Sequence, residues 1–557
     1  MPHWQQQLVD HGLLAGRTLP STNGDIVVVS PVNGKNPGNY DLSSTLQLGS
    51  ITFNASQAYT ITGGPIGLAS GGSVTDNQTN GVGTADAFNN GFTLNGPATF
   101  TANTGTQGSH FNGVIGGTGG FTVTNNGPAD GMQLNAVNTY TGATTISGTA
   151  RVFAGVNGAI PTGSALTVNG SFLFGASSTI GSLAGGGAVF MNGNNTLTVG
   201  GDNTGTTFSG VYQNSGGSAA LTKAGTGTLT LSGANTYTGA TTVNAGTLAV
   251  TGSIVSPVTV NSGGTLGGTS TINNTVTVNS GGTLGPGLSP GILNTGTLTL
   301  TGGSTLTIEL NGPTVGSQYD QVNVTGTVTL GGATLNVVLG FTPTAGQVFT
   351  IINNDAADPV TGTFAGLAEG STFTAGGHQF SISYVGGTGN DVTLTAADVP
   401  PTISKAFGAA SIPLNGTTSL TFTISKPNAG TSLTGVGFSD ALPSGLVVAT
   451  PNGLTCSCGG GTITAVAGSS SVSLSGATLA ASGFCTFAVN VTGTSAGTKN
   501  NTTSAVTSNE GGSGGTASAP LTVSAAPIPT MSTWAFLLLA LVLTMTAVRA
   551  LRLRRIF

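Results

Sequence analysis

Charged residues are scarce in this 557-residue sequence, because only 5% of its residues are Asp, Glu, Lys or Arg. An ordinary soluble protein has roughly 25%. The net charge is −5, and four of the 11 basic residues fall in the last nine positions. A body almost free of positive charge excludes nucleic acid as an expected partner. The length by itself indicates several domains.

Cysteine is also scarce, and all three residues, Cys456, Cys458 and Cys485, lie in one C-terminal region. The first 455 residues therefore gain nothing from disulfides or metal thiolates. The N-terminal stretch "MPHWQQQLVDHGLLAG" lacks a basic start followed by an apolar core, so it contains no recognisable secretory signal. Because the rest of the chain resembles an exported protein, we expect a truncated or misassigned start, with a genuine cytosolic start as the alternative.

Glycine is abundant, at 94 residues, and short runs of alternating Val, Leu and Thr end in it. Such runs are typical of short strands joined by tight turns. The word "VTVNSGGTLG" occurs at 258–267 and again at 276–285, a shift of 18 residues. Since alternate side chains of a strand face opposite sides, Val258, Val260 and Leu266 are expected inside, with Thr259 and Asn261 outside.

A two-strand unit of this size cannot bury its apolar face alone, but 18-residue coils can cover one another when they stack. We therefore predict an all-β chain built on a right-handed parallel β-solenoid, or β-helix, over residues 41–315, after an N-terminal segment at 1–40. Asparagine side chains in equivalent positions of successive coils are expected to bond along the axis.

The octet "NTYTGATT" stands at 138–145 and again at 235–242, each time 27 residues after a phenylalanine, Phe111 or Phe208. We interpret the octet as one corner of the stack, passed repeatedly, where Asn and Gly suit tight turns. The longer segment at 221–250, "LTKAGTGTLTLSGANTYTGATTVNAGTLAV", resembles the autotransporter-associated β-strand repeat, and 111–152 carries a partial copy. The resemblance implies an exported, elongated β-helix on a bacterial surface, although the chain lacks that family's terminal series of alternating ten-residue strands.

Aromatic residues gather between 316 and 397, a segment that we interpret as the last solenoid coils and an aromatic cap over the apolar end of the stack. Residues 398–524 follow a Pro-Pro break and contain short strands with regular turns. This pattern predicts an immunoglobulin-like β-sandwich. Its inward-facing residues are expected to be Leu420, Phe422, Ile424, Cys485, Phe487, Val489 and Val491.

Cys485 heads an inward-facing run, so a disulfide to Cys456 or Cys458 would join two strands and contribute about 2–4 kcal/mol. The residues alone leave the choice open. The segment from "LTCSCGGG" to "CTFAVNVTG" resembles a domain of unknown function common in bacterial surface proteins, and this resemblance implies the pair Cys458 and Cys485. A zinc site would need a fourth ligand, and this module contains no histidine.

The C-terminal segment, 525–557, contains 18 uncharged residues from Met531 to Val548, which predicts a transmembrane helix rather than a buried core helix. Trp534 stands where interfacial aromatic residues occur. The basic residues that follow place the tail in the cytoplasm and the body outside. These basic residues are Arg549, Arg552, Arg554 and Arg555.

This tail also resembles the IPTL-type C-terminal sorting signal of Gram-negative bacteria. Ile528, Pro529, Thr530 and Trp534 match the signal, whereas Met531 replaces its usual leucine. The resemblance implies that a membrane protease cuts near the motif and releases or re-attaches the body. An unprocessed tail would be a membrane anchor.

Candidate catalytic groups have no evident partners. Asp202 has no acid one 18-residue coil away, and Asp320 is interpreted as a turn or cap residue. His110 and His378 lack a nearby nucleophile or ligand set. The motif "GGTGND" at 386–391 is a single copy, and we interpret it as a turn rather than a calcium site. We therefore predict no catalytic, cofactor-binding or metal-binding residue.

The sequence thus predicts a non-enzymatic surface or extracellular protein, structural or adhesive, that is held in the membrane at least transiently. Its expected partners are the membrane, a sorting protease, and surface glycans, host or neighbouring cells, or further copies of itself. The alternatives are an extracellular polysaccharide-acting enzyme on the same scaffold, and the passenger portion of an autotransporter.

Overall fold

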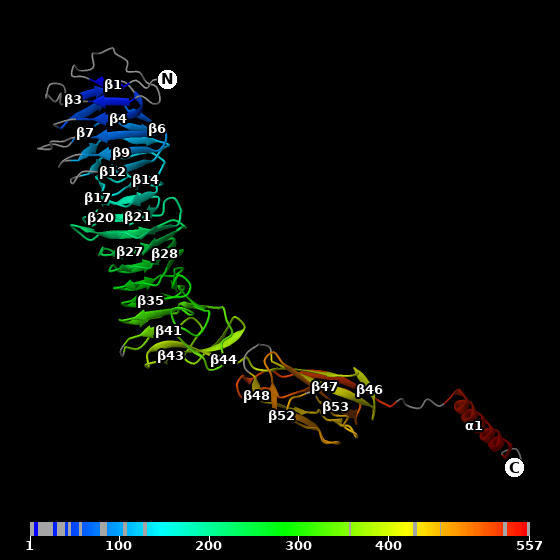
Figure 1. The fold of residues 1–557 in the computed structure, drawn as a ribbon. Coiled ribbons are helices and arrows are strands. Elements are labelled where there is room, and N and C mark those ends of the chain that lie inside the picture. The colour runs from blue at the N-terminus through cyan, green and yellow to red at the C-terminus, as the bar shows by residue number, and fades with distance from the viewer. Residues whose placement is uncertain are drawn as a thin grey trace. The chain divides into compact units, whose positions relative to one another are not determined.

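The computed structural model describes residues 5–8, 26–29, 39–42, 46–54, 58–77, 86–103, 108–125, 131–355, 358–426, 432–456, 458–526 and 532–553. The chain divides into two compact units, Met1–Ala396 and Ala397–Phe557. Apart from one C-terminal helix, the regular elements of the described residues are strands (Figure 1). The predicted all-β class is confirmed.

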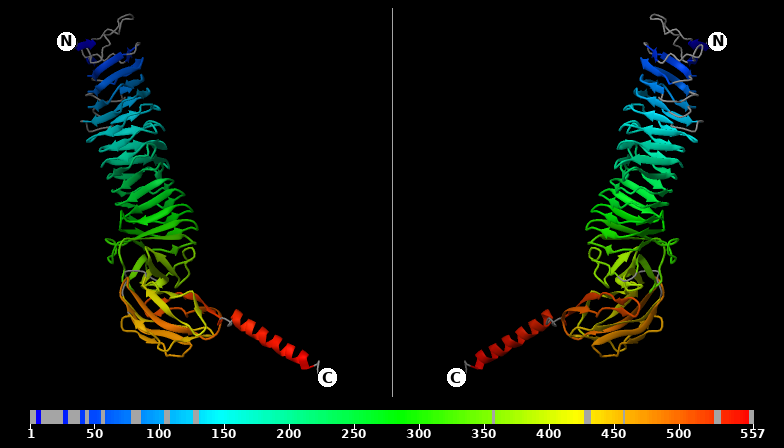
Figure 2. Two further views of the ribbon diagram at one scale, coloured as in Figure 1. Left: turned by 90° about the vertical axis from the view of Figure 1, so that its right-hand side faces the viewer. Right: turned by 90° about the vertical axis from the view of Figure 1, so that its left-hand side faces the viewer.

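The first unit is a stack of coils whose strands pair in parallel with those of the coils before and after (Figures 1 and 2). An 11-stranded sheet begins with β1(Gln5–Leu8), β2(Ile26–Val29) and β4(Leu46–Phe53), so strands of the predicted N-terminal segment already belong to the stack. A nine-stranded sheet carries the candidate site. Its strands are β3(Asn39–Leu42), β5(Thr60–Gly63), β7(Asp86–Phe88), β10(Ser109–Phe111), β13(Met132–Leu134), β15(Arg151–Ala154), β17(Ser171–Phe174), β20(Ala188–Asn192) and β23(Val211–Ser215).

From about residue 178 onward, each coil contributes to three parallel sheets. The eight-stranded sheet contains β18(Ser178–Ile180), β21(Thr196–Val199), β24(Ala220–Lys223), β27(Thr241–Val243), β30(Val258–Val260), β33(Val276–Val278), β36(Leu298–Leu300) and β39(Val328–Thr329). The seven-stranded sheet contains β22(Thr206–Phe208), β25(Thr228–Leu231), β28(Gly246–Val250), β31(Gly264–Gly268), β34(Thr283–Pro286), β37(Thr305–Leu310) and β40(Thr334–Leu339).

The pairing register reproduces the 18-residue repeat. Val258 lies opposite Val276, and Leu266 lies opposite Leu284. Val258, Val260 and Leu266 are all buried, whereas Thr259 is not. The inward and outward faces that alternation predicted are therefore confirmed, and the β-solenoid with them. Each inward side chain packs on its counterpart one coil away. This stacking of like residues explains why the two copies of the repeat have the same sequence.

Both copies of the octet form the same local corner. The side-chain oxygens of Asn138 and Asn235 accept hydrogen bonds from backbone N–H groups of the preceding coil, at 2.8 and 2.9 Å. The buried hydroxyls of Tyr140 and Tyr237 each bond the threonine four positions later, at 2.7 and 2.6 Å. However, β14(Thr144–Ile146) belongs to the 11-stranded sheet and β27 to the eight-stranded sheet. What recurs is the corner structure, which leads into strands of different sheets.

Asparagine side chains also connect successive coils, as predicted, because each amide donates to the amide oxygen of its neighbour at 2.7 to 3.1 Å. Such ladders satisfy polar groups that one coil could not satisfy alone. Among the described residues such ladders are Asn54–Asn77–Asn103, Asn89–Asn112–Asn135, Asn244–Asn261–Asn279 and Asn294–Asn323–Asn353.

The C-terminal end of the stack closes where parallel pairing gives way to antiparallel pairing. β41(Val348–Asn354) pairs in parallel with β38(Gln321–Val324) on one side and antiparallel with β44(Asp391–Ala397) on the other. Phe349 lies at 5.3 to 6.4 Å, between ring centroids, from Tyr319, Phe341 and Phe380. These rings cover the apolar end, which is the role expected of a solenoid cap.

The second unit contains three mainly antiparallel sheets around one core. β47(Thr417–Ser425) pairs with β53(Phe484–Gly493), and the inward residues predicted on both strands are buried. The rings of Phe422, Phe438 and Phe487 contact one another at centroid distances of 5.0 to 6.1 Å. The immunoglobulin-like arrangement of these sheets stays a prediction. Cys458 is joined to Cys485 by a disulfide, and Cys456 is exposed and free.

Helix α1(Thr533–Leu553) is capped by Ser532, whose Oγ accepts a hydrogen bond from Ala535 N at 3.3 Å. Its large apolar side chains are exposed on all sides, and no part of the span from Thr533 to Arg552 is buried. Thr544 and Thr546 donate their hydroxyl hydrogens to carbonyls of the same helix. Among the described residues this is the one helix that is long and apolar enough to cross a membrane.

Candidate functional site

The acids and histidines considered from the sequence lie apart. Asp202 is a turn residue that accepts hydrogen bonds from Ser182 Oγ at 2.7 Å and from Thr204. Burial opposes ionisation, but these hydrogen bonds together hold the pKa of Asp202 below its ordinary value. Asp320 accepts from the backbone N–H groups of Gly291 and Glu309 at 2.7 and 2.8 Å, and burial raises its pKa to about 6.

The two histidines occupy strands, His110 on β10 and His378 at the start of β43(His378–Gly386). The turn "GGTGND" joins β43 to β44, and its Asp391 accepts hydrogen bonds from the backbone N–H groups of Asn354 and Thr388. This carboxylate therefore holds the hairpin to the neighbouring strand. Within the described ranges no group of three His, Cys, Asp or Glu side chains is placed to hold a metal ion.

Only part of the predicted C-terminal signal can be placed. Trp534, Arg549 and Arg552 lie exposed on α1. The motif residues Ile528, Pro529, Thr530 and Met531, and the basic residues Arg554 and Arg555, lie outside the described residues.

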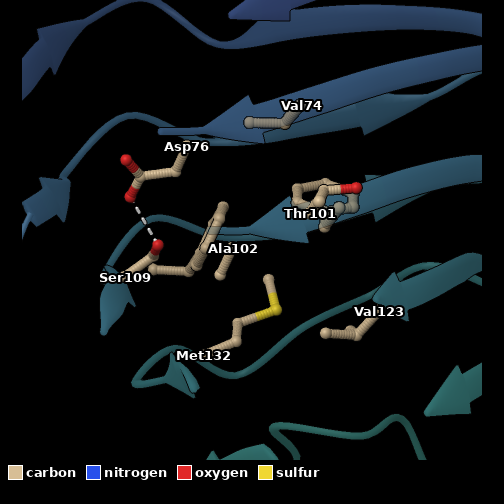
Figure 3. Close-up of a pocket in the computed structure, with 9 residues that line it drawn as sticks. Val74, Asp76, Thr101, Ala102, Ser109, Val123 and Met132 are labelled. Carbon is tan, nitrogen blue, oxygen red and sulfur yellow. Dashed lines mark hydrogen bonds between the residues drawn. The ribbon is translucent and has the colours of Figure 1, made fainter. Parts of the chain in front are cut away.

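One pair of acids that the sequence did not single out is buried inside the N-terminal coils. Asp86 is fully buried on β7, and Asp76, at the end of β6(Ile66–Asp76), is 2% exposed. Asp76 accepts a hydrogen bond from Ser109 Oγ at 2.6 Å beside a cavity of about 10 Å³ (Figure 3). Burial, followed by the charge of Asp76, raises the pKa of Asp86 to about 9. Asp86 is therefore protonated at neutral pH.

We predict that the N-terminal coils lose stability as the pH rises. Between pH 4 and about 9 the unfolded chain releases the Asp86 proton while the folded chain keeps it. The free energy of unfolding therefore falls with each unit by which the pH rises. Asp86→Asn should raise the urea midpoint of these coils at pH 8 and reduce the difference between pH 5 and pH 8. Asp202→Asn is the matched control: the pKa of Asp202 is lowered, so this carboxyl is ionised in the folded and the unfolded chain from pH 5 to pH 8, and its replacement should leave the pH dependence in that range unchanged. Equal changes in the pH dependence of the two variants would contradict the assignment.

The outward face of the eight-stranded sheet is uncharged and regular. In the eight-stranded sheet, one outward threonine per coil lies opposite the next over eight successive strands. This ladder consists of Thr179, Thr198, Thr222, Thr242, Thr259, Thr277, Thr299 and Thr329. Threonine suits a half-exposed strand position, so the ladder is accounted for by strand formation alone.

The nine-stranded sheet departs from this regularity. Phe153, Leu173 and Phe190 occupy its outward face and lie opposite one another on β15, β17 and β20. Gln133 precedes them on β13, and Gln213 follows on β23. The inward neighbours Val152, Phe172 and Val189 already fill the core, so the outward apolar rungs are not needed for the solenoid interior.

The column beside these rungs has no side chain at two positions, and neighbouring side chains fill the space. The Asn89–Asn112–Asn135 ladder runs beside them, but Gly155 and Gly175 take the next two positions in its column. A Cβ added at Gly175 would meet Phe153 Cζ at 2.8 Å, so the ring lies against the bare backbone. An open groove of about 610 Å³ lies over the outward side chains of β15, β17 and β20. It is lined by Gln133, Arg151, Val152, Phe153, Ser171, Leu173, Phe190 and Ser215.

Arg151 supplies the charge of this groove. It opens β15, it is exposed, and Ser171 lies opposite it on β17. Lys223, the other basic residue within the described part of the first unit, is 1% exposed. Arg151 thus provides the exposed cation of the described solenoid, and it faces no ion-pair partner there. The sequence analysis did not predict this groove. A signal was present, because the segments "RVFAG" and "SFLFG" each place an outward apolar residue where threonine is usual.

Two family models match parts of the chain. The passenger-associated-transport-repeat matches residues 132–148 and 221–250, and a domain of unknown function (DUF7933) matches residues 401–523. The first match confirms the autotransporter-associated repeats, which point to an autotransporter passenger domain and suggest a surface or secreted protein. No curated protein matches the chain.

Several solved structures resemble a part of the chain. A bacterial hydrophobin, BslA, is 18% identical, covers 24% of this chain and 98% of its own, with a TM-score of 0.19. A cohesin module of a Clostridium perfringens family 33 glycoside hydrolase is 11% identical, with 23% and 99% covered and a TM-score of 0.19. A non-cellulosomal cohesin from Archaeoglobus fulgidus is 16% identical, with 22% and 92% covered and a TM-score of 0.17. Likenesses at this level carry no information on function.

Proposed function

We propose that this chain is a non-enzymatic, exported bacterial surface protein, structural or adhesive, whose solenoid is its working surface. The observation that supports this best is the passenger-type repeat at 221–250 within a stack of parallel coils. A solenoid grows by adding coils that contact only their neighbours, so it gives an extended surface from a simple repeat. The passenger portion of an autotransporter is the second candidate, favoured by the same repeat.

Helix α1 would hold the chain in a membrane, at least transiently. Its 20-residue span is about 30 Å long, the thickness of a bilayer core. The threonine hydroxyls within it bond to the helix itself, as an apolar surrounding requires. Arg549 and Arg552 at its end would lie on the cytoplasmic side. A sorting protease cutting near the motif that begins at Ile528 would release the body.

Placing aspartate at Leu539 and Leu543 together should remove the chain from the membrane fraction of producing cells. Each charge at the centre of a span costs about 3 kcal/mol on insertion scales. Thr544→Ser, which changes no charge, should leave fractionation unchanged, and immunoblotting of membrane, soluble and medium fractions measures both. A wild-type chain found only in the cytosol would refute export. An intact mass that retains residues 532–553 in the surface-exposed protein would refute sorting by cleavage.

A further inference from the structure

We propose that the groove over β15, β17 and β20 binds an acidic glycan, whose sugar rings lie on Phe153, Leu173 and Phe190 and whose anionic group pairs with Arg151. The inference rests on the proposed surface location, where such polymers are met. It specifies the ligand class and the residues that would recognise it.

The shape of the groove suits a short stretch of polymer. Its volume of about 610 Å³ falls within the range of small-ligand sites, about 300–1,000 Å³. Successive rungs of a sheet are about 4.8 Å apart, so the three apolar rungs span roughly 10 Å along the stack. The ring of Phe153 lies against the backbone of Gly175 and forms part of the groove wall.

The chemistry of the lining is mixed in the way that a sugar requires. A pyranose ring presents C–H groups on its faces and hydroxyls around its edge. Phe153 and Phe190 offer half-exposed aromatic surface for the faces. Gln133, Ser171 and Ser215 line the same groove and offer donors and acceptors for the hydroxyls. A contiguous run of outward apolar side chains, unlike a single one, is typical of a binding surface.

Charge complementarity selects an acidic sugar. Arg151 is exposed, and its planar guanidinium donates two parallel hydrogen bonds to a carboxylate or sulfate. A single cation matches one anionic group per binding site. It does not match the dense charge of nucleic acid, which requires several basic residues.

An added peptide strand fits this surface poorly. β13, β15, β17 and β20 are each paired on both sides. Their backbone N–H and C=O groups are therefore not available as a free edge for β-augmentation. Recognition has to use the outward side chains, and these are the apolar, amide, hydroxyl and guanidinium groups described above.

The experiment is calorimetric titration of the detergent-solubilised full chain with oligogalacturonate, with dextran sulfate and with neutral dextran of similar length. We expect binding to at least one anionic polymer and at least tenfold weaker binding to dextran. Arg151→Gln should weaken anionic binding by about tenfold and reduce its salt dependence. Phe190→Thr, which restores the usual outward residue of this solenoid, should also weaken it by about tenfold.

Lys499→Gln is the matched control, because it removes an outward cation from the second unit and should change neither affinity nor salt dependence. Circular dichroism and thermal unfolding establish that each variant is folded. A preference for oligogalacturonate identifies a carboxylate ligand, and a preference for dextran sulfate a sulfate ligand; both support the groove. The inference is overturned if the wild type binds neither anionic polymer, or if folded Arg151→Gln and Phe190→Thr bind as the wild type does. Cell fractionation is independent of this test, so a surface-located chain without glycan binding refutes the groove alone.

Discussion

Replacing Lys223 with methionine is expected to destabilise the coils around it by about 3 kcal/mol. Lys223 lies on the inward side of β24 and is 1% exposed. Its Nζ donates to the carbonyl oxygens of Ala224, Gly225 and Ala245 at 2.5, 2.9 and 3.2 Å. Methionine fills the space of the aliphatic stem but leaves those three carbonyls without their donor.

The position explains why a lysine is tolerated inside. Lys223 lies between Val199 and Val243 in an inward column, so its stem packs like an apolar side chain while the ammonium reaches the corner. Burial lowers the pKa of Lys223 from its ordinary value. The hydrogen bond to Ala245 joins one coil to the next, whereas those to Ala224 and Gly225 are local.

Hydrogen exchange of peptides spanning 217–250, combined with urea unfolding, would measure this effect, because a solenoid opens locally. Thr222→Val is the matched control: it lies next to Lys223 on the outward threonine ladder and should change stability by less than about 0.5 kcal/mol. If these peptides exchange as slowly in Lys223→Met as in the wild type, the ammonium contributes nothing to coil stacking.

Removing the disulfide is expected to have the largest effect on the second unit. Cys458 and Cys485 are 27 residues apart, and a closed loop of that length contributes about 3.5 kcal/mol by restricting the unfolded chain. Cys458→Ala and Cys485→Ala should each lower the unfolding free energy by that amount under oxidising conditions. Under reducing conditions the variants and the wild type should differ much less.

Cys456→Ala tests the choice between the two neighbouring cysteines. Cys456 is exposed and free, whereas Cys458 is 7% exposed and packs in the core. We therefore expect Cys456→Ala to stay within about 0.5 kcal/mol of the wild type in urea unfolding. A loss as large as that of Cys485→Ala would mean that Cys456 is the true partner. Thiol counting of the wild type should find one free cysteine.

Much of the fold was predictable because its determinants are local. The alternation around Val258 and Val260 assigns inside and outside, and the 18-residue shift to Val276 assigns the rung above. The repeated octet predicted a recurring corner of the stack. The stacking of equivalent positions predicted the hydrogen bonds between asparagine side chains. The charge-free terminal run predicted α1 in the same way.

The candidate site was less predictable because it joins residues of coils that differ in length. Phe153, Leu173 and Phe190 are 20 and then 17 residues apart, so no fixed period aligns them. The buried carboxyls of Asp76 and Asp86 lie on strands of different sheets, so no alternation along one strand brings them together. A lysine on a strand is ordinarily solvated, and only the tertiary structure shows that Lys223 is enclosed.

The sequence by itself determined that this chain is a stack of thin coils followed by a cysteine-containing β-rich module and an apolar helix. Those features depend on the alternation of inward and outward residues along a strand and on uninterrupted apolar runs. Both are properties of neighbouring positions in the sequence. The tertiary structure decided which outward residues share a column, which acids meet inside the stack and which cysteine pairs with Cys485. These depend on the register between segments about 20 or more residues apart, which is set only when the coils stack and the sheets pack.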